Sequence, residues 1–105
     1  MHFVETPVFT AGLRRHLGDE SYRAIQLSLA LRPEQGPLIP RSAGLRKLRW
    51  AASGRGKRGK VRVIYYWHRA SETIYLLYFY AKNVQGDLTP AQVKRLAQLV
   101  REEFQ

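Results

Sequence analysis

The sequence predicts an α+β domain: a small, mostly antiparallel sheet with two N-terminal helices and one C-terminal helix. Three strand-like runs between residues 45 and 81 are joined by short connections, which is typical of an antiparallel meander. Segments with one apolar helical face lie before and after these runs. The chain has 105 residues, so we expect residues 1–105 to form a single domain.

The first half of the chain predicts one strand and two helices. Residues 2–5 alternate weakly and fit a short strand, and residues 6–16 fit a helix. A second helix follows with Asp19 as its N-cap, and it ends at Pro33 because proline cannot continue the helical hydrogen bonds. Residues 33–44 are rich in proline and glycine and are expected to form a loop.

The second half predicts the sheet and the last helix. The three strands are expected at residues 45–51, 60–68 and 73–81. A glycine-rich, charged hairpin loop at 52–59 joins the first two, and a turn at 69–72 joins the next two. Thr89-Pro-Ala-Gln92 matches a capping box, which predicts a helix over 90–104. We expect the helices to pack on one face of the sheet and to leave the other face available.

Basic residues are concentrated in the middle of the chain. The formal net charge is +10, and the segment between Gln35 and Ser71 accounts for all of it, since it has ten basic residues and no acid. These residues are Arg41, Arg46, Lys47, Arg49, Arg55, Lys57, Arg58, Lys60, Arg62 and Arg69. A sheet that presents aligned cations is suited to several phosphates at once, which favours an RNA- or DNA-directed protein.

Strand alternation predicts which face holds the cations. Leu48 and Trp50 suit the face covered by helices, so Lys47, Arg49 and Arg62 are expected on the open face. Aromatic neighbours there would allow base stacking. Solubilising charge is the simpler alternative, but solvated faces usually mix both signs.

Several other functions are disfavoured by composition. The chain has no cysteine, so it has no disulfide and no thiolate site. Its three histidines have no metal-ligand spacing, and we expect no metal and no cofactor. No signal-peptide pattern or membrane-length apolar run is present, so we expect a cytoplasmic protein without membrane contact.

Three short motifs resemble a known family. They are Gly44-Leu-Arg-Lys-Leu-Arg49, Lys60-Val-Arg-Val-Ile-Tyr-Tyr66 and Tyr78-Phe-Tyr-Ala-Lys-Asn83. Together with the order of elements they resemble the RelE/ParE superfamily of type II toxins over nearly the whole chain, and the HigB-like branch is the most similar. The resemblance implies a RelE-like fold and a ribosome-dependent endoribonuclease that cuts mRNA in the decoding site and is blocked by a cognate antitoxin. Such an enzyme is metal-independent and acts through the 2′-hydroxyl of its RNA.

The resemblance and the charge pattern together predict the site residues. The expected catalytic residues are Lys47, Arg49, Arg62 and Lys82, with Tyr80 added because it ends its strand next to Lys82. Residues expected to hold mRNA or ribosomal RNA by charge are Arg46, Arg55, Lys57, Arg58 and Lys60. Asn83 stands where many RelE members have arginine, and no aromatic residue lies between Tyr80 and Phe104, so the general acid is left open.

Two alternative functions stay open at this point. One is a non-cleaving, ParE-like inhibitor of DNA gyrase on the same fold, and the other is an RNA-binding module without activity. The combination of Lys47, Arg62 and Lys82 favours the nuclease over the gyrase inhibitor. Discrete mRNA cuts would exclude the inactive module.

Overall fold

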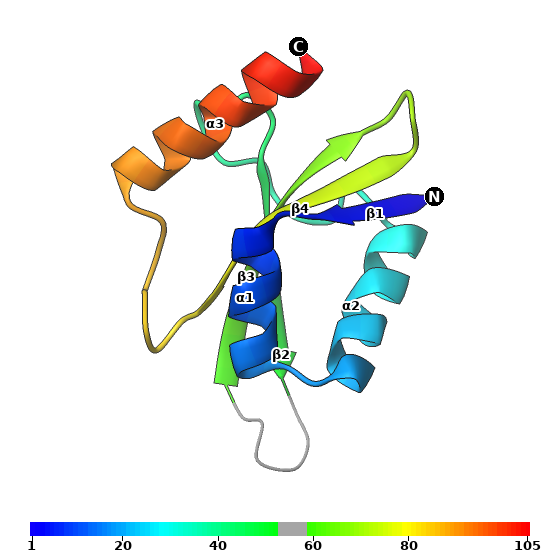
Figure 1. The fold of residues 1–105 in the computed structure, drawn as a ribbon, viewed down its shortest axis with the longest axis vertical. Helices are drawn as coiled ribbons and strands as arrows, with labels where there is room; N and C mark the ends of the chain where they lie inside the picture. The colour runs from blue at the N-terminus through cyan, green and yellow to red at the C-terminus, as the bar shows by residue number, and fades with distance from the viewer. Residues whose placement is uncertain (53–58) are drawn as a thin grey trace.

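The computed structural model of the protein describes residues 1–52 and 59–105, and it confirms the type and order of the predicted elements (Figure 1). They are β1 (His2–Glu5), α1 (Pro7–His16), α2 (Asp19–Leu31), β2 (Arg46–Ala52), β3 (Gly59–His68), β4 (Thr73–Ala81) and α3 (Pro90–Phe104). The N-cap predicted for α2 is wrong, because Gly18 occupies that position. Asp19 and Glu20 lie in the first turn instead, where the helix dipole favours negative charge.

The strands form one mixed, four-stranded sheet in the order β1-β4-β3-β2. β1 is parallel to β4, and the other neighbours are antiparallel. The register shifts within β4, where Tyr65 of β3 pairs with Leu76 and Ile64 pairs with Tyr78. This β-bulge leaves Leu77 as an extra residue and turns Leu77 and Tyr78 toward the same apolar cluster.

Helices α1 and α2 cover one face of the sheet, here called the α1/α2 face. Phe9 and Leu29 from these helices are fully buried in one cluster with Val63 of β3. Gly12 allows α1 to approach β4 closely, because a Cβ at this position would lie 2.7 Å from the carbonyl oxygen of Phe79. This face is therefore the main apolar core of the protein.

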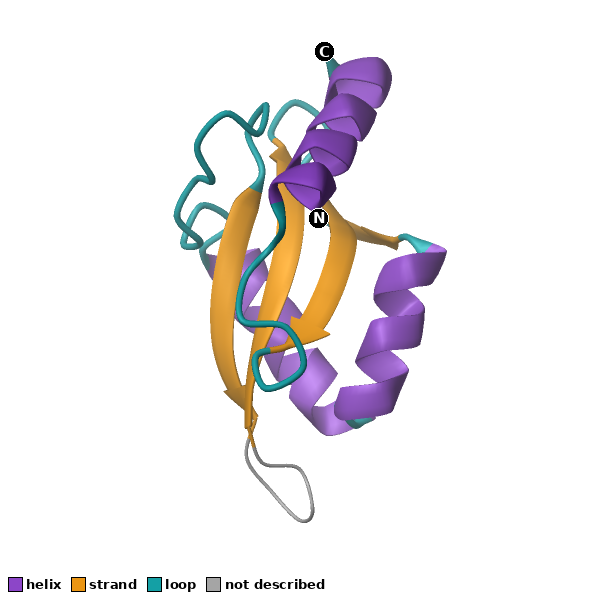
Figure 2. Cartoon of the chain, turned by 90° about the vertical axis from the view of Figure 1, so that its left-hand side faces the viewer, coloured by secondary structure: helices purple, strands orange, loops and turns teal. Residues whose placement is uncertain are grey.

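Helix α3 packs on the opposite face, here called the α3 face, as Figure 2 shows. The prediction that all helices share one face is therefore wrong. Val100 of α3 is buried in a second cluster with Leu45 and Ile64, and Phe104 stacks on Tyr66 with ring centroids 5.2 Å apart. The physical reason is that β3 carries apolar residues on both of its faces, so both faces need a cover.

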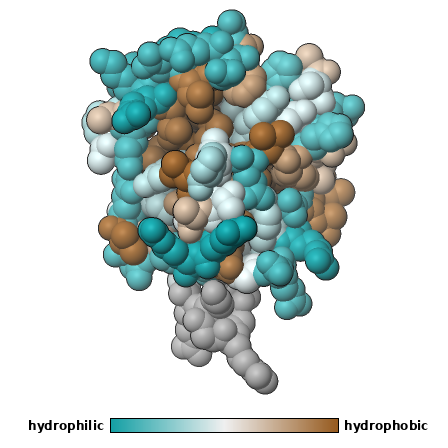
Figure 3. Space-filling view, in the orientation of Figure 1, coloured by the Kyte–Doolittle hydropathy of each residue, from teal (hydrophilic) through white to brown (hydrophobic). Residues whose placement is uncertain are grey.

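The cover on the α3 face is incomplete. Figure 2 shows α3 over one end of the sheet, and on this face no helix of the described residues covers the far ends of β2 and β3. Figure 3 shows a further apolar hollow between α3 and the start of α1, which Val8, Tyr78 and Leu96 help to line. In the described part of the chain, no helix is long and apolar enough to cross a membrane.

Candidate nucleic-acid interface

A row of three side chains crosses the α3 face beside the area that α3 covers. Arg49 of β2 pairs directly with Arg62 of β3, and Arg62 pairs with Tyr80 of β4. Direct partners in antiparallel strands point to the same face with Cβ atoms about 5 Å apart. Like charges opposite each other destabilise a sheet, so the adjacent arginines oppose stability and favour an anionic ligand.

Arg62 is the least exposed cation of this row. Its relative exposure is only 7%, and its one side-chain hydrogen bond within the described residues is donated by a guanidinium nitrogen to the carbonyl oxygen of Val61, at 3.1 Å. No carboxylate among those residues pairs with it. A buried charge without a counterion is unfavourable, so Arg62 is poised to receive an anion such as a phosphate.

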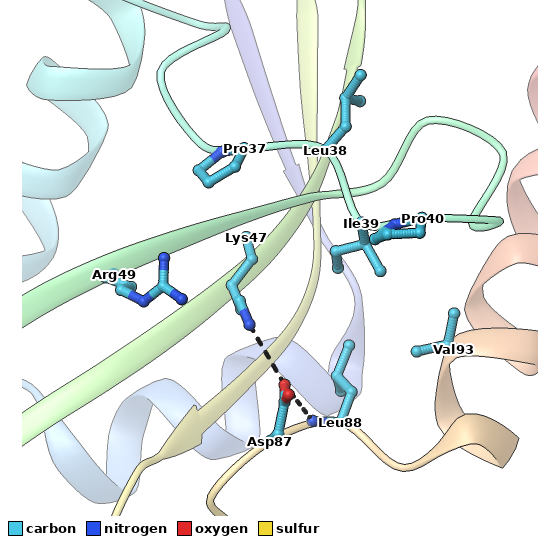
Figure 4. A pocket seen from close by; sticks show the side chains of 9 residues that line it. All are labelled: Pro37, Leu38, Ile39, Pro40, Lys47, Arg49, Asp87, Leu88 and Val93. Atoms are coloured by element: carbon cyan, nitrogen blue, oxygen red, sulfur yellow. Dashed lines mark hydrogen bonds and ion pairs between the residues drawn. The ribbon is translucent and has the colours of Figure 1, made fainter.

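Lys47 lies on the same face and borders a cleft of about 280 Å³ (Figure 4). Its ammonium nitrogen is 3.3 Å from a carboxylate oxygen of Asp87, which lies in the segment between β4 and α3. The backbone N–H of Leu88 donates to that oxygen at 2.8 Å. This hydrogen bond and the Lys47 ammonium hold the pKa of Asp87 below its usual range.

The hydroxyl group of Tyr80 is buried and lies near the Asp87 carboxylate, but it makes no hydrogen bond of normal length within the described residues. Burial and the negative charge of Asp87 raise the pKa of Tyr80, and the charges of Arg62 and Arg49 lower it in part. A buried, unpaired hydroxyl is unfavourable without a ligand. Tyr80 therefore keeps its proton at neutral pH and offers an unused donor beside two arginines.

Two further lysines extend the row toward the hairpin. Lys60 lies two residues from Arg62, so it shares the α3 face, and it helps to line a shallow hollow with Arg49 and Arg62. The backbone N–H of Lys82 donates to the carbonyl oxygen of Lys60 at 2.9 Å. Both lysines are exposed. The face thus offers cations on both sides of the arginine pair.

The structure brings most, but not all, of the predicted residues together. Lys47, Arg49, Arg62, Tyr80 and Lys60 share the α3 face, and Lys82 adjoins it through the backbone. The other predicted residues differ. Arg46 points away from this face: it donates hydrogen bonds to the carbonyl oxygens of Glu34 and Gly36, at 2.9 Å each, so it fastens the loop after α2 instead. Arg55, Lys57 and Arg58 lie outside the described residues.

Sequence reasoning missed Asp87, which is the acidic member of the site. One signal was available, because Asp87 is the only acid between Glu72 and Glu102 and directly precedes the capping box of α3. Its pairing with Lys47, forty residues earlier in the chain, follows from the tertiary fold. In the described ranges, no three His, Asp or Glu side chains gather in a way that would hold a metal ion.

Comparisons with known proteins support the same fold. No protein-family model matches the sequence. A mutant of the E. coli toxin RelE in the free state superposes with a TM-score of 0.62 at 11% identity, over 98% of this chain and 97% of the other. The toxin–antitoxin complex RelBE of E. coli matches with a TM-score of 0.54 at 14% identity, over 74% of this chain and 92% of the matched chain. At these identities the comparisons establish architecture, and the chain has a RelE-like fold.

Proposed function

We propose that this chain is the toxin of a type II toxin–antitoxin system and acts as a ribosome-dependent mRNA endoribonuclease. The observation that carries the proposal is the buried guanidinium of Arg62, which has no carboxylate partner within the described residues and lies between Arg49 and the hydroxyl of Tyr80. Supporting this, one structural neighbour is a toxin and another is a toxin–antitoxin complex. Membership of the HigB-like branch remains a prediction from the motifs.

The proposed reaction uses the RNA as its own nucleophile. The 2′-oxygen attacks the adjacent phosphorus, the bond from phosphorus to the 5′-oxygen breaks, and the products are a 2′,3′-cyclic phosphate and a 5′-hydroxyl. One proton leaves the 2′-hydroxyl and one reaches the 5′-oxygen. The reaction therefore needs a base, an acid and positive charge on the non-bridging oxygens.

The row on the α3 face supplies two of these three requirements directly. Arg62 and Arg49 hold the non-bridging oxygens, because guanidinium groups stay charged and bind phosphate in a fixed geometry. Tyr80 donates to the leaving 5′-oxygen, since its raised pKa keeps the hydroxyl protonated. In this scheme the protein's own cations stabilise the phosphorane, and the ribosome supplies much of the positioning.

The base is Lys47 or Lys82, and the two stand in different settings. Lys47 lies in the cleft as an ammonium paired with Asp87, so it must leave that contact and release a proton before its neutral amine can accept the proton of the 2′-hydroxyl. Lys82 is exposed at the end of β4. The pH–rate profiles of Lys47→Ala and Lys82→Ala separate them, because losing the base removes the rising limb of the profile.

The test of the proposal is a map of mRNA 5′ ends in cells that express the chain. We expect discrete cuts in translated messages, no cuts when initiation is blocked, and loss of the cuts in Arg62→Ala. Arg14→Ala is the matched control, since Arg14 is an exposed arginine of α1 on the other side of the sheet. Growth arrest without cuts and with inactive DNA gyrase would replace the proposal by the gyrase inhibitor. RNA binding without arrest or cuts would leave only a binding module.

The proposal also implies two macromolecular partners. Lys60 and the basic residues at 55–58 are expected to grip ribosomal RNA, so their removal should flatten the salt dependence of ribosome cosedimentation. The cognate antitoxin is expected to present an acidic surface, because a net charge of +10 speeds association with a complementary partner. An association rate that does not fall with rising salt would place the antitoxin on an apolar surface instead.

A further inference from the structure

A second groove runs between the loop at residues 39–41 and α3, with a volume of about 490 Å³. It adjoins the Lys47 cleft, since Ile39, Pro40, Leu88 and Val93 line both hollows. We infer that this groove, here called the α3 groove, holds the RNA nucleotides next to the cut phosphate. This inference rests on the proposed function and adds a binding site to it.

The charges of the α3 groove suit a polyanion. Its charged lining, as far as the structure describes it, consists of Arg41, Lys94 and Arg101, with no carboxylate. Lys94 and Arg101 are seven residues apart, so they lie on one side of α3 and about 10 Å apart along its axis. That separation is too long for both to hold one phosphate. The two side chains and Arg41 are therefore placed to follow a phosphate backbone over more than one nucleotide.

The walls of the α3 groove are held in place before any ligand binds. Ser42 is buried, and its hydroxyl donates to the carbonyl oxygen of Ile39 at 2.6 Å and accepts from the N–H of Leu45 at 3.1 Å. Arg41 has a φ of 54°, a left-handed conformation that a non-glycine residue rarely adopts without tertiary support. The side chain of Gln105, next to the end of α3, donates to the carbonyl oxygen of Ala43 at 2.8 Å. These contacts tie the loop and helix into one rigid frame.

The floor of the α3 groove favours RNA over an acidic peptide as the occupant. Pro40 and Pro90 line the groove with apolar rings and have no backbone N–H, so a base can pack against them without leaving a donor unpaired. Because the α3 groove adjoins the cleft, an RNA strand with its phosphate at Arg62 and Arg49 needs only a short extension to reach it. An acidic peptide would match the charges of Arg41, Lys94 and Arg101, but it would gain nothing from the position of the α3 groove beside the Lys47 cleft.

The test compares short and extended RNAs that cannot be cleaved. A fluorescein-labelled trinucleotide and two hexanucleotides, one extended at each end, carry 2′-O-methyl groups that remove the nucleophile. Binding to the full chain is followed by fluorescence anisotropy. For wild type we expect one extension to tighten binding by about ten-fold or more, since charge-assisted contacts are added.

The variant Arg41→Ala/Lys94→Ala/Arg101→Ala should lose that gain and keep wild-type affinity for the trinucleotide. For the extended RNA, the slope of log Kd against log salt concentration should decrease by about 2, because each phosphate contact to a single strand contributes about 0.7 to that slope. Arg95→Ala is the matched control, because Arg95 neighbours Lys94 but lines the apolar hollow toward α1 (Figure 3). It should retain the gain. Helical content by circular dichroism verifies that each variant is folded.

Three outcomes overturn the inference. They are equal affinity of wild type for short and extended RNAs, a full gain in the triple variant, and a loss of the gain in Arg95→Ala. A glutamate-rich synthetic peptide serves as the competing ligand, and if only its binding is lost in the triple variant, the α3 groove is a protein site. Arg62→Ala tests the underlying function separately: unchanged trinucleotide binding by this variant contradicts the proposed function, whereas the outcomes above contradict only the α3 groove.

Discussion

The α1/α2 face and the α3 face belong to the same strands, but they differ in how completely their buried groups are satisfied. On the α1/α2 face, the hydroxyl of Tyr65 donates to the carbonyl oxygen of Pro33 at 2.7 Å and accepts from the N–H of Gly36 at 3.0 Å. On the α3 face, the hydroxyl of Tyr80 has no partner and Arg62 has no carboxylate, within the described residues. Saturated interactions favour stability, and unsatisfied ones favour a ligand. The difference separates the face that holds the fold from the face that we propose binds RNA.

The largest expected effect on stability lies on the α1/α2 face. Phe9 is fully buried and meets the ring of Phe79 edge-on, with centroids 5.8 Å apart. Phe9→Ala should lower the free energy of unfolding by about 3–5 kcal/mol, from lost burial and a residual cavity. Val100→Ala, at a fully buried position of α3, should cost no more than about 2 kcal/mol. Urea unfolding measures both, and a larger loss for Val100→Ala would reverse the assignment of the main core.

The next effect concerns activity on the α3 face. Arg62→Met should reduce mRNA cleavage by roughly 10²–10³-fold, because a preorganised charge at the phosphate is lost. The same variant should be as stable as wild type, or more stable by about 0.2–1 kcal/mol, since the repulsion from Arg49 across the strands disappears. Cleavage assays and urea unfolding on the same preparations decide. A strongly destabilised Arg62→Met would mean that Arg62 is structural.

Two tyrosines provide a matched comparison of the faces. Tyr65→Phe should cost about 1–3 kcal/mol, because it leaves the carbonyl oxygen of Pro33 and the N–H of Gly36 without a partner. Tyr80→Phe removes a hydroxyl that has no hydrogen-bond partner within the described residues, so it should leave stability unchanged or slightly raised while slowing cleavage. Equal losses of unfolding free energy in the two variants would contradict the proposed difference between the hydrogen-bonded hydroxyl of Tyr65 and the hydroxyl of Tyr80.

The sequence was a good guide to local structure and to one face of each strand. Alternation along β2 and β3 placed Lys47, Arg49 and Arg62 together, and the capping box at Thr89 gave the start of α3. Both patterns are short-range, so no knowledge of the fold was needed. The RelE-like architecture was instead predicted from the resemblance of three short motifs and from the order of elements, although the chain is only 11% identical to a solved RelE structure.

The errors arose where long-range packing decides. The apolar face of an amphipathic helix indicates that the helix packs against the protein, but not which face of the sheet it covers. The position of α3 was therefore mispredicted. The bulge at Leu77 breaks the alternation of β4, so Leu77 and Tyr78 pack in the same cluster although they are consecutive residues. Arg46 looked like part of the basic surface, but alternation turns it toward the carbonyl oxygens of Glu34 and Gly36. The errors on α3 and β4 reflect contacts between separate elements, whereas the orientation of Arg46 already follows from strand alternation.

Alkaline pH should weaken the protein through its buried tyrosines. Burial raises the pKa of Tyr65 from its ordinary value of 10.0. A raised pKa means that the folded state holds the proton more tightly, so this contribution is complete below about pH 10 and declines as the pH rises toward the raised value. Unfolding free energies measured from about pH 8 to 11 should fall for wild type and fall less steeply for Tyr65→Phe. Parallel curves for the two proteins would contradict the assignment to Tyr65.

The smallest expected effect on stability belongs to Asp87, although its position is central to the proposed site. Its ion pair with Lys47 is exposed on the carboxylate side, where 71% of the Asp87 side chain is accessible. Asp87→Asn should therefore change the free energy of unfolding by less than about 1 kcal/mol. The pKa of Asp87 lies below its ordinary value of 3.8, so this small contribution is present above that value and lost as the pH falls through the lowered one. The difference between wild type and variant should vanish in strong acid.

The affinity of Asp87→Asn for a 2′-O-methyl trinucleotide should instead rise about two- to five-fold, because a negative charge next to the phosphate site is removed. Weaker RNA binding by Asp87→Asn would mean that Asp87 positions Lys47 for the substrate rather than competing with the RNA phosphate. The direction of the change in RNA affinity therefore distinguishes the two roles.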